Sequence, residues 1–186
     1  ITLDLVLFTY VGREQSTLRD FSFTVEPGGL GRLTGESGGG KTTVSTLINV
    51  LLELGGGGTL GGTVTVNGQD VSKLPLWELA QTVGSVFQNP KSQFFNLDTN
   101  SEVLFGLESR GASHQEMEQA LSSAERVCGV GPLLDRNIFA LSGGEKQRIA
   151  CASAYAMEPE VFVLDEPSST LDDEGIRQLR EILKKM

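Results

Sequence analysis

The stretch Leu33-Thr34-Gly35-Glu36-Ser37-Gly38-Gly39-Gly40-Lys41-Thr42-Thr43 fits the pattern of a phosphate-binding loop. Glycines let the backbone curl until successive N–H groups point at phosphate oxygens, and a side chain there would block the approach. We expect Lys41 to reach the β- and γ-phosphates and Thr42 to offer its hydroxyl to Mg²⁺. The nucleotide-binding residues expected from this loop are Gly35, Glu36, Ser37, Gly38, Gly39, Gly40, Lys41, Thr42 and Thr43.

The segments around this loop predict its supports. Residues 41–53 have the apolar spacing of a helix, whose positive N-terminal end would face the phosphates. Residues 30–34 are expected to form the strand that feeds the loop, although Gly31 and Arg32 stand where a buried strand prefers Val or Ile. Residues 3–10 and 21–25 partly alternate between apolar and polar, which predicts an antiparallel start, and residues 63–66 predict a further strand that ends in a turn. The glycine run at 55–58 is expected to be a surface loop.

Composition limits the class of protein. A chain of 186 residues suits one domain with a sizeable core. The 15 basic and 24 acidic residues give a net charge of −9, so we expect no nucleic-acid partner. Cys128 and Cys151 lack metal-ligand spacing, which favours packed, reduced thiols in a reducing cytosol. No apolar run approaches the length of a membrane span, and the start has no signal-peptide pattern, so we expect a soluble chain.

Two later strands end in polar residues. Residues 83–87 predict a short buried strand followed by Gln88, and residues 161–164 predict a buried strand followed by Asp165 and Glu166. The carboxyl ends of strands in open α/β sheets are where ligands bind. Gln88 is therefore a site candidate, and two carboxylates beside a phosphate loop suit a metal ligand and a base.

The other segments predict helices. Trp77 lies in a short helix as a half-buried packing residue, and residues 89–140 form a helical insertion in which Ser113 caps one helix and His114 is solvated. Ser142 and Glu145 repeat the capping pattern and open a helix that runs to about residue 157. The last helix is capped near residues 172–173 and carries Ile176, Leu179 and Leu183 on one face.

Taken in order, the phosphate loop, Gln88, Leu141-Ser142-Gly143-Gly144-Glu145-Lys146-Gln147-Arg148 and Leu164-Asp165-Glu166-Pro167 resemble the ATPase subunits of ATP-binding-cassette transporters. The resemblance implies an α/β fold: a P-loop NTPase (RecA-like) core with an N-terminal antiparallel β subdomain and an inserted α-helical subdomain. It implies a single domain, residues 1–186, with the core at 1–88 and 141–186 and the helical subdomain at 89–140.

The resemblance also implies an ATPase that uses ATP and Mg²⁺. Tyr10 matches the aromatic residue that stacks on adenine. Lys41, Gln88 and Glu166 match the catalytic residues, and Glu166 positions or deprotonates the attacking water. The implied metal ligands are Thr42, Gln88 and, through water, Asp165. Two cassettes, identical or different, pair head to tail in this family, so that the signature residues Ser142, Gly143, Gly144 and Glu145 act on the partner chain's ATP.

Residues 86–96 and 102–108 look like the energy-coupling-factor group, which imports vitamins and cobalt or nickel. That resemblance implies transmembrane partner subunits and a cytoplasmic protein, peripheral on the inner face of the membrane. The transported substrate is bound by other subunits and is not readable here. The family's switch histidine falls beyond Met186, so the chain resembles a C-terminally truncated member, expected to bind Mg-ATP and hydrolyse it slowly. Two alternatives stay open: a soluble, non-transport cassette ATPase, and a nucleotide-binding module with little turnover.

Overall fold

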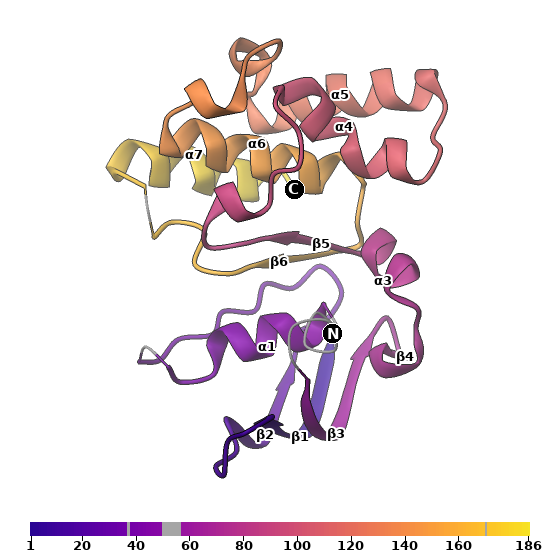
Figure 1. Cartoon of the computed structure of the whole chain (residues 1–186), viewed down its shortest axis with the longest axis vertical. Helices are drawn as coiled ribbons and strands as arrows, with labels where there is room; N and C mark the ends of the chain where they lie inside the picture. Colours follow the sequence, from indigo (N-terminus) through magenta and orange to yellow (C-terminus); the bar gives the residue numbers. More distant parts are fainter. Residues whose placement is uncertain (37, 50–56, 170) are drawn as a thin grey trace. The chain divides into compact units, whose positions relative to one another are not determined.

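The computed structural model describes residues 1–36, 38–49, 57–169 and 171–186. By its internal contacts the chain divides into two compact units, Ile1–Ala80 and Gln81–Met186, named here the N-terminal and C-terminal units (Figure 1). Among the described residues, the N-terminal unit holds a four-stranded sheet and the C-terminal unit a two-stranded sheet. The finer domain organisation expected from the sequence stays a prediction.

In the N-terminal unit, β1 (Thr2–Tyr10) pairs antiparallel with β2 (Leu18–Thr24) and with β3 (Gly58–Val66). β4 (Gln69–Asp70) completes the order β2-β1-β3-β4. This confirms the predicted antiparallel start. Asn67 and Gly68, both with positive φ (51° and 77°), turn β3 into β4, as the sequence predicts. Helix α1 (Lys41–Ile48) packs against β3 and buries Val44 and Leu47.

The strand predicted at residues 30–34 is wrong, because residues 25–36 contain no strand. Leu30 is 94% exposed, so the segment lacks the buried alternation that a strand needs. The backbone at Gly31 lies directly on β2, since an added Cβ would be 2.6 Å from the ring of Phe23 and 2.5 Å from Val25. Of the predicted helix at 41–53, residues 50–53 lie outside the described residues, as do residues 55 and 56 of the glycine run.

In the C-terminal unit, β5 (Val83–Val86) and β6 (Val161–Leu164) pair in parallel, with Val86 opposite Leu164. Helices α4 (Thr99–Ser109), α5 (His114–Cys128) and α6 (Gly143–Ala156) pack against one another, and α6 also contacts β5. Helix α6 lies in the core, where Ile149, Ala150, Cys151 and Ala152 are fully buried. Across both units, the other helices of the described residues are α3 (Leu76–Thr82), α7 (Asp173–Leu183) and the 3₁₀ turns Val71–Lys73, Pro90–Ser92, Gly131–Leu133 and Ile138–Ala140.

The predicted helix starts at Ser113 and Ser142 are confirmed, because each serine forms a capping box with the glutamate three residues later. Asp172 caps α7, also as expected. One side-chain prediction fails, because Trp77 is 67% exposed rather than half-buried. In α7 the buried positions are Leu179 and Ile182, while Leu183 is 37% exposed.

Candidate functional site

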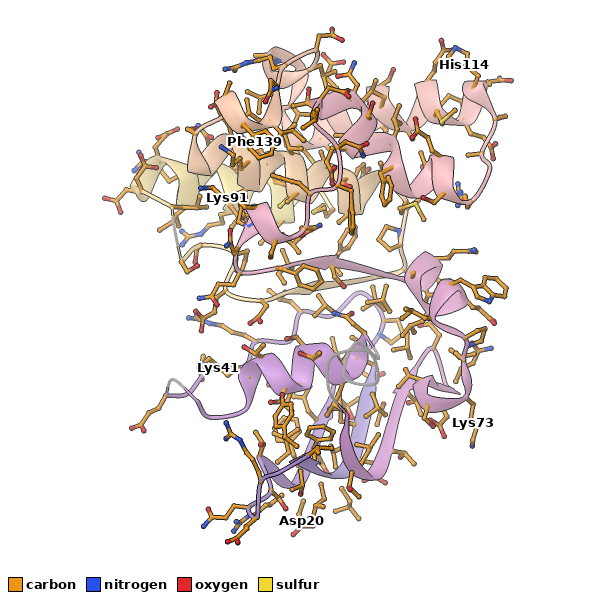
Figure 2. All side chains as sticks on the ribbon, in the orientation of Figure 1. Asp20, Lys41, Lys73, Lys91, His114 and Phe139 are labelled. Carbon is orange, nitrogen blue, oxygen red and sulfur yellow. The ribbon has the colours of Figure 1, made fainter. Side chains whose placement is uncertain are left out.

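The phosphate loop leads into a helix that has no side-chain cap. Gly40 precedes α1 with left-handed backbone (φ 85°, ψ 5°), and within the described residues its N-cap position makes no side-chain cap hydrogen bond. Lys41, labelled in Figure 2, donates from Nζ to the carbonyls of Gly35 and Glu36, each at 2.9 Å. Ser37 lies outside the described residues. Uncapped N–H groups at a helix start, beside an ammonium group, form an arrangement that suits anionic phosphate.

Tyr10 is fixed beside this loop within the N-terminal unit. Its hydroxyl shares a hydrogen bond with Oγ1 of Thr43 (3.0 Å), and its ring meets Phe8 edge to face at 4.9 Å. The guanidinium of Arg13 lies 5.9 Å from the ring centroid. Arg13 also lines a hollow of about 480 Å³, together with residues 14–17 and Gly38. An aromatic ring that contacts the helix after the phosphate loop, beside an arginine that lines a hollow, suits contact with a nucleobase.

In the C-terminal unit, parallel pairing brings Gln88 and Glu166 together. Asp165 donates from its backbone N–H to the carbonyl of Val86 (3.0 Å), which continues the ladder past β6. Two residues beyond the pair Val86 and Leu164, Nε2 of Gln88 donates to Oε2 of Glu166 (3.0 Å). The structure therefore joins two residues that the sequence placed at separate strand ends.

Glu166 has left-handed backbone, with φ at 42°. For a residue with a side chain this conformation costs about 1–2 kcal/mol, and such strain concentrates at functional sites. The turn is held by a hydrogen bond from the Ser169 N–H to the carbonyl of Glu166 (3.0 Å). The exposed carboxylate thus leaves the strand end in a direction that the backbone fixes.

The predicted metal ligands supply suitable donors for Mg²⁺. Thr42 offers a hydroxyl in the N-terminal unit, and Gln88 and Asp165 offer oxygens in the C-terminal unit. Because Gln88 donates through its nitrogen to Glu166, its amide oxygen is the atom left for a cation. Within the described ranges, His, Cys, Asp and Glu form no cluster of three or more that could hold a metal ion.

A second glycine-rich turn opens α6, and its own side chains shape it. Oγ of Ser142 accepts from the N–H of Glu145 (3.3 Å), and the carboxylate of Glu145 accepts from the N–H of Ser142 (2.7 Å). The hydrogen bonds that this carboxylate accepts from Ser142, with the nearby Arg136, hold the pKa of Glu145 below its ordinary value. Ser142 and Gly143 are exposed. This segment, residues 142–145, is called the signature turn below.

The segment before the signature turn is tied to the loop that follows Gln88. The N–H of Ile138 donates to the carbonyl of Leu97 (2.8 Å), and Thr99 and Arg136 exchange two hydrogen bonds. The buried carboxylate of Glu102 accepts from the N–H groups of Phe95 (3.0 Å) and of the next residue.

Sequence reasoning missed Glu102, Arg136 and Lys146. No spacing rule marks Glu102 or Arg136, whereas a lysine in the first turn of a helix, where basic residues are disfavoured, was a readable signal for Lys146.

The family model described as ABC transporter matches residues 18–169. A putative ABC transporter ATP-binding protein of Treponema denticola is 44% identical over 186 residues, which are 100% of this chain and 38% of that protein. The energy-coupling factor transporter ATP-binding protein EcfA1 of Lactobacillus delbrueckii subsp. bulgaricus is 39% identical over 189 residues, covering 100% of this chain and 65% of that protein.

A solved structure, cbiO1 of Clostridium perfringens, described as part of the ABC transporter complex cbiONQ, matches with a TM-score of 0.85 and 25% identity. The match covers 98% of this chain and 71% of cbiO1. It supports the α/β cassette fold expected from the sequence. The chain spans between about a third and two thirds of the length of the two curated relatives named above. Among the helices of the described residues, none is long and apolar enough to cross a membrane.

Proposed function

Because this chain belongs to the ABC transporter family, we propose that it binds and hydrolyses ATP and thereby powers transport through partner membrane proteins. The observation that carries the proposal is the pair of helix starts: an uncapped one beside Lys41 and a self-capped, exposed one at Ser142. A nucleotide held by the first leaves phosphate oxygens for the second, supplied by another copy or a related chain in head-to-tail pairing.

The proposed chemistry assigns one role to each group. The N–H groups of α1 and the ammonium of Lys41 hold the β- and γ-phosphates. Thr42, Gln88 and, through water, Asp165 would hold Mg²⁺, which would offset phosphate charge. The carboxylate of Glu166 orients the attacking water or accepts its proton. The hydrogen bond from Gln88 holds this carboxylate in place until the water arrives. Tyr10 contacts the base.

Mixing two defective chains tests the shared site. We expect Lys41→Ala to abolish ATP binding, and Ser142→Arg to bind ATP without turning it over, because the bulky charge enters the partner's phosphate site. In a mixed head-to-tail dimer one site carries both defects and the other carries neither. Phosphate release should therefore return on mixing, with each variant alone as the matched control. No recovery, with both variants folded, would contradict the pairing.

Slow turnover by this 186-residue chain would not hide the result, since Glu166→Gln gives a second readout. That variant keeps the shape of the side chain but removes the carboxylate that acts on water. We expect it to bind ATP normally and to form an ATP-dependent dimer, detected by analytical ultracentrifugation. Equal loss of ATP affinity in Lys41→Ala and Glu166→Gln would contradict the separate roles.

For the membrane partner, exposed apolar residues after Gln88 give the best candidate surface. Phe95 is 75% exposed and Leu97 66% exposed, and Phe95 stacks on Phe105 with ring centroids 5.0 Å apart. Exposed aromatic clusters of this kind mark interaction sites. Together with the likeness to EcfA1, this surface supports an energy-coupling-factor type of transporter, with vitamins or cobalt or nickel as substrate classes and a cytoplasmic position at the membrane.

The Phe95 surface is testable without knowledge of the substrate. We expect Phe95→Asp to abolish copurification of transmembrane proteins from solubilised membranes of the source cell and to leave ATP affinity unchanged. Val11→Asp, at another exposed apolar residue (75%), in the N-terminal unit, is the matched control. If the unaltered protein brings down no membrane protein, the transport proposal fails and a soluble cassette ATPase takes its place.

A further inference from the structure

Lys146 occupies an unfavourable position in the C-terminal unit. Only 6% of the residue is exposed, and its Nζ donates to the backbone carbonyls of Phe139 (3.4 Å) and Leu141. A buried ammonium group loses hydration, and a carbonyl offers no opposite charge to offset that loss. The group also lies at the end of the first turn of α6, where the helix dipole disfavours a cation. A residue kept under these conditions needs a compensating role.

The carbonyls that Lys146 holds belong to the segment that leads into the signature turn. Phe139 is 72% exposed, while its neighbours Ile138 and Leu141 are 1% and 4% exposed, so the segment crosses from the surface to the core within three residues. On its other side the segment is fixed by the ion pair of Arg136 with Glu145 (3.2 Å). Two consecutive side chains of α6, residues 145 and 146, thus hold the segment at different points.

We infer that Lys146 is a positioning residue for the signature turn. Its ammonium group fixes the carbonyls of Phe139 and Leu141, and this sets the direction in which Ser142 and the glycines after it face a nucleotide. The capping box alone sets the shape of the turn relative to α6, whereas Lys146 sets the path of the chain that enters it. The inference rests on the proposed function, because the turn meets a nucleotide only in the head-to-tail pair.

The test uses the Glu166→Gln chain, in which ATP-dependent pairing is readable without turnover. Adding Lys146→Met removes the donor at similar volume. We expect the ATP affinity of the single chain, measured with a fluorescent ATP analogue, to change less than about twofold, while ATP-dependent pairing weakens about tenfold or more through loss of charge-assisted hydrogen bonds. Lys146→Arg restores a charged donor and should recover most of the pairing.

Ile149→Ala is the matched control for stability. Ile149 lies in the same helix at 0% exposure, so its truncation destabilises the core without touching either carbonyl. We expect this variant to lower Tm and leave pairing intact. The inference is overturned if Lys146→Met pairs normally, or if Ile149→Ala weakens pairing equally at matched loss of Tm.

Hydrogen exchange supplies a readout that does not need pairing. In the nucleotide-free chain we expect Lys146→Met to speed exchange in the peptide covering residues 139–144 and to leave the rest of α6 protected, whereas Ile149→Ala should speed exchange along α6. If Lys146→Met fails to fold, Lys146→Gln, a donor of shorter reach, takes its place under the same criteria. If the parent Glu166→Gln chain does not pair with ATP, the proposed function fails while exchange still decides the role of Lys146: local exchange supports it and unchanged exchange refutes it.

Discussion

Two helices of this chain begin in glycine-rich turns, and they differ in whether side chains cap their first N–H groups. Helix α1 follows Gly40, whose backbone is left-handed, and it has neither a side-chain cap nor an acidic residue in its first turn. Helix α6 follows Ser142 and carries Glu145 in its first turn, and the two residues exchange hydrogen bonds. The first helix start is left open for a ligand, and the second is closed by its own residues.

The contrast separates two ways of presenting N–H groups to phosphate. An uncapped helix start gains most from an anion, because the anion acts as the missing cap. A self-capped turn gains less, but its shape is already set before any ligand arrives. We therefore expect α1 to supply the affinity for the nucleotide and the signature turn to supply geometry.

The largest expected effect tests whether the two helix starts belong to separately stable parts. Both cysteines lie in the C-terminal unit, and burial raises the pKa of Cys128 and of Cys151 to about 12. Since thiolate is the reactive form and the ordinary thiol pKa is about 8.5, we expect the folded thiols at pH 8 to react with a disulfide reagent about a thousandfold more slowly than in urea. Gly40→Ala, in the other unit, should leave the native rate unchanged. A rise of the rate in that variant would mean that the two units unfold together.

Next in size is the effect on nucleotide affinity. Lys41→Ala should weaken binding of a fluorescent ATP analogue to the single chain about a hundredfold, because charged hydrogen bonds to phosphate are lost. Ser142→Ala should change the same dissociation constant less than about twofold, since its turn would act on the partner's nucleotide. Similar losses in both would remove the distinction between the two helix starts.

The glycines of the two turns should differ in what the fold requires of them. At Gly40 an added Cβ would lie 2.8 Å from Cδ2 of Leu18 on left-handed backbone, so Gly40→Ala should cost about 1–3 kcal/mol of unfolding free energy. At Gly144 the nearest atom, Cδ2 of Leu171, would be 3.9 Å away, so Gly144→Ala should be neutral or gain up to about 1 kcal/mol from helix propensity. Urea unfolding followed by circular dichroism measures both. A large loss in Gly144→Ala would mean that the fold itself needs that glycine.

The sequence predicted the pieces that depend on local chemistry. Capping boxes at Ser113 and Ser142 were readable because the bonded residues are three apart. The turn at Asn67 was readable because few residue types accept positive φ. The sequence predicted that Gln88 and Glu166 each follow a buried strand, but it did not predict that they meet. Parallel pairing of the two strands in register, seen in the structure, places the two side chains 3.0 Å apart.

Features that depend on tertiary contact were not predicted. At residues 30–34 the position between the break at residues 27–29 and the phosphate loop favoured a strand, yet the backbone at Gly31 lies against the side chains of Phe23 and Val25 instead. Trp77 was expected to be half-buried on hydrophobicity alone, and nothing in the sequence says that its neighbours leave it exposed. Lys146 donates to carbonyls of the segment that precedes Ser142, and the sequence of that segment does not predict the path of its backbone.

The smallest expected effect concerns acid. Hydrogen bonds from Ser142, assisted by Arg136, lower the pKa of Glu145, while its unfolded value is about 4.3. A group whose folded pKa is depressed contributes stability above its unfolded pKa and loses that contribution as pH falls through the folded value. Lowering the pH from 7 to 3 should therefore destabilise the signature turn by about 1 kcal/mol, which is the usual contribution of a helix cap. Amide hydrogen exchange in the turn should then be about fivefold faster than the intrinsic pH dependence of exchange predicts.

Two other helix starts serve as comparisons. The capping box at Glu116, whose pKa is lowered by Ser113 in the same way, should also loosen in acid, whereas the start of α1, with no acidic residue in its first turn, should not. Glu145→Gln keeps a side chain that reaches the Ser142 N–H but does not titrate, so its turn should exchange at a rate that shows no excess acid dependence. If the acid-dependent increase in exchange were equal at all three helix starts, acid would be acting on the whole fold. The pH dependence of exchange would then not distinguish an open helix start from a self-capped one.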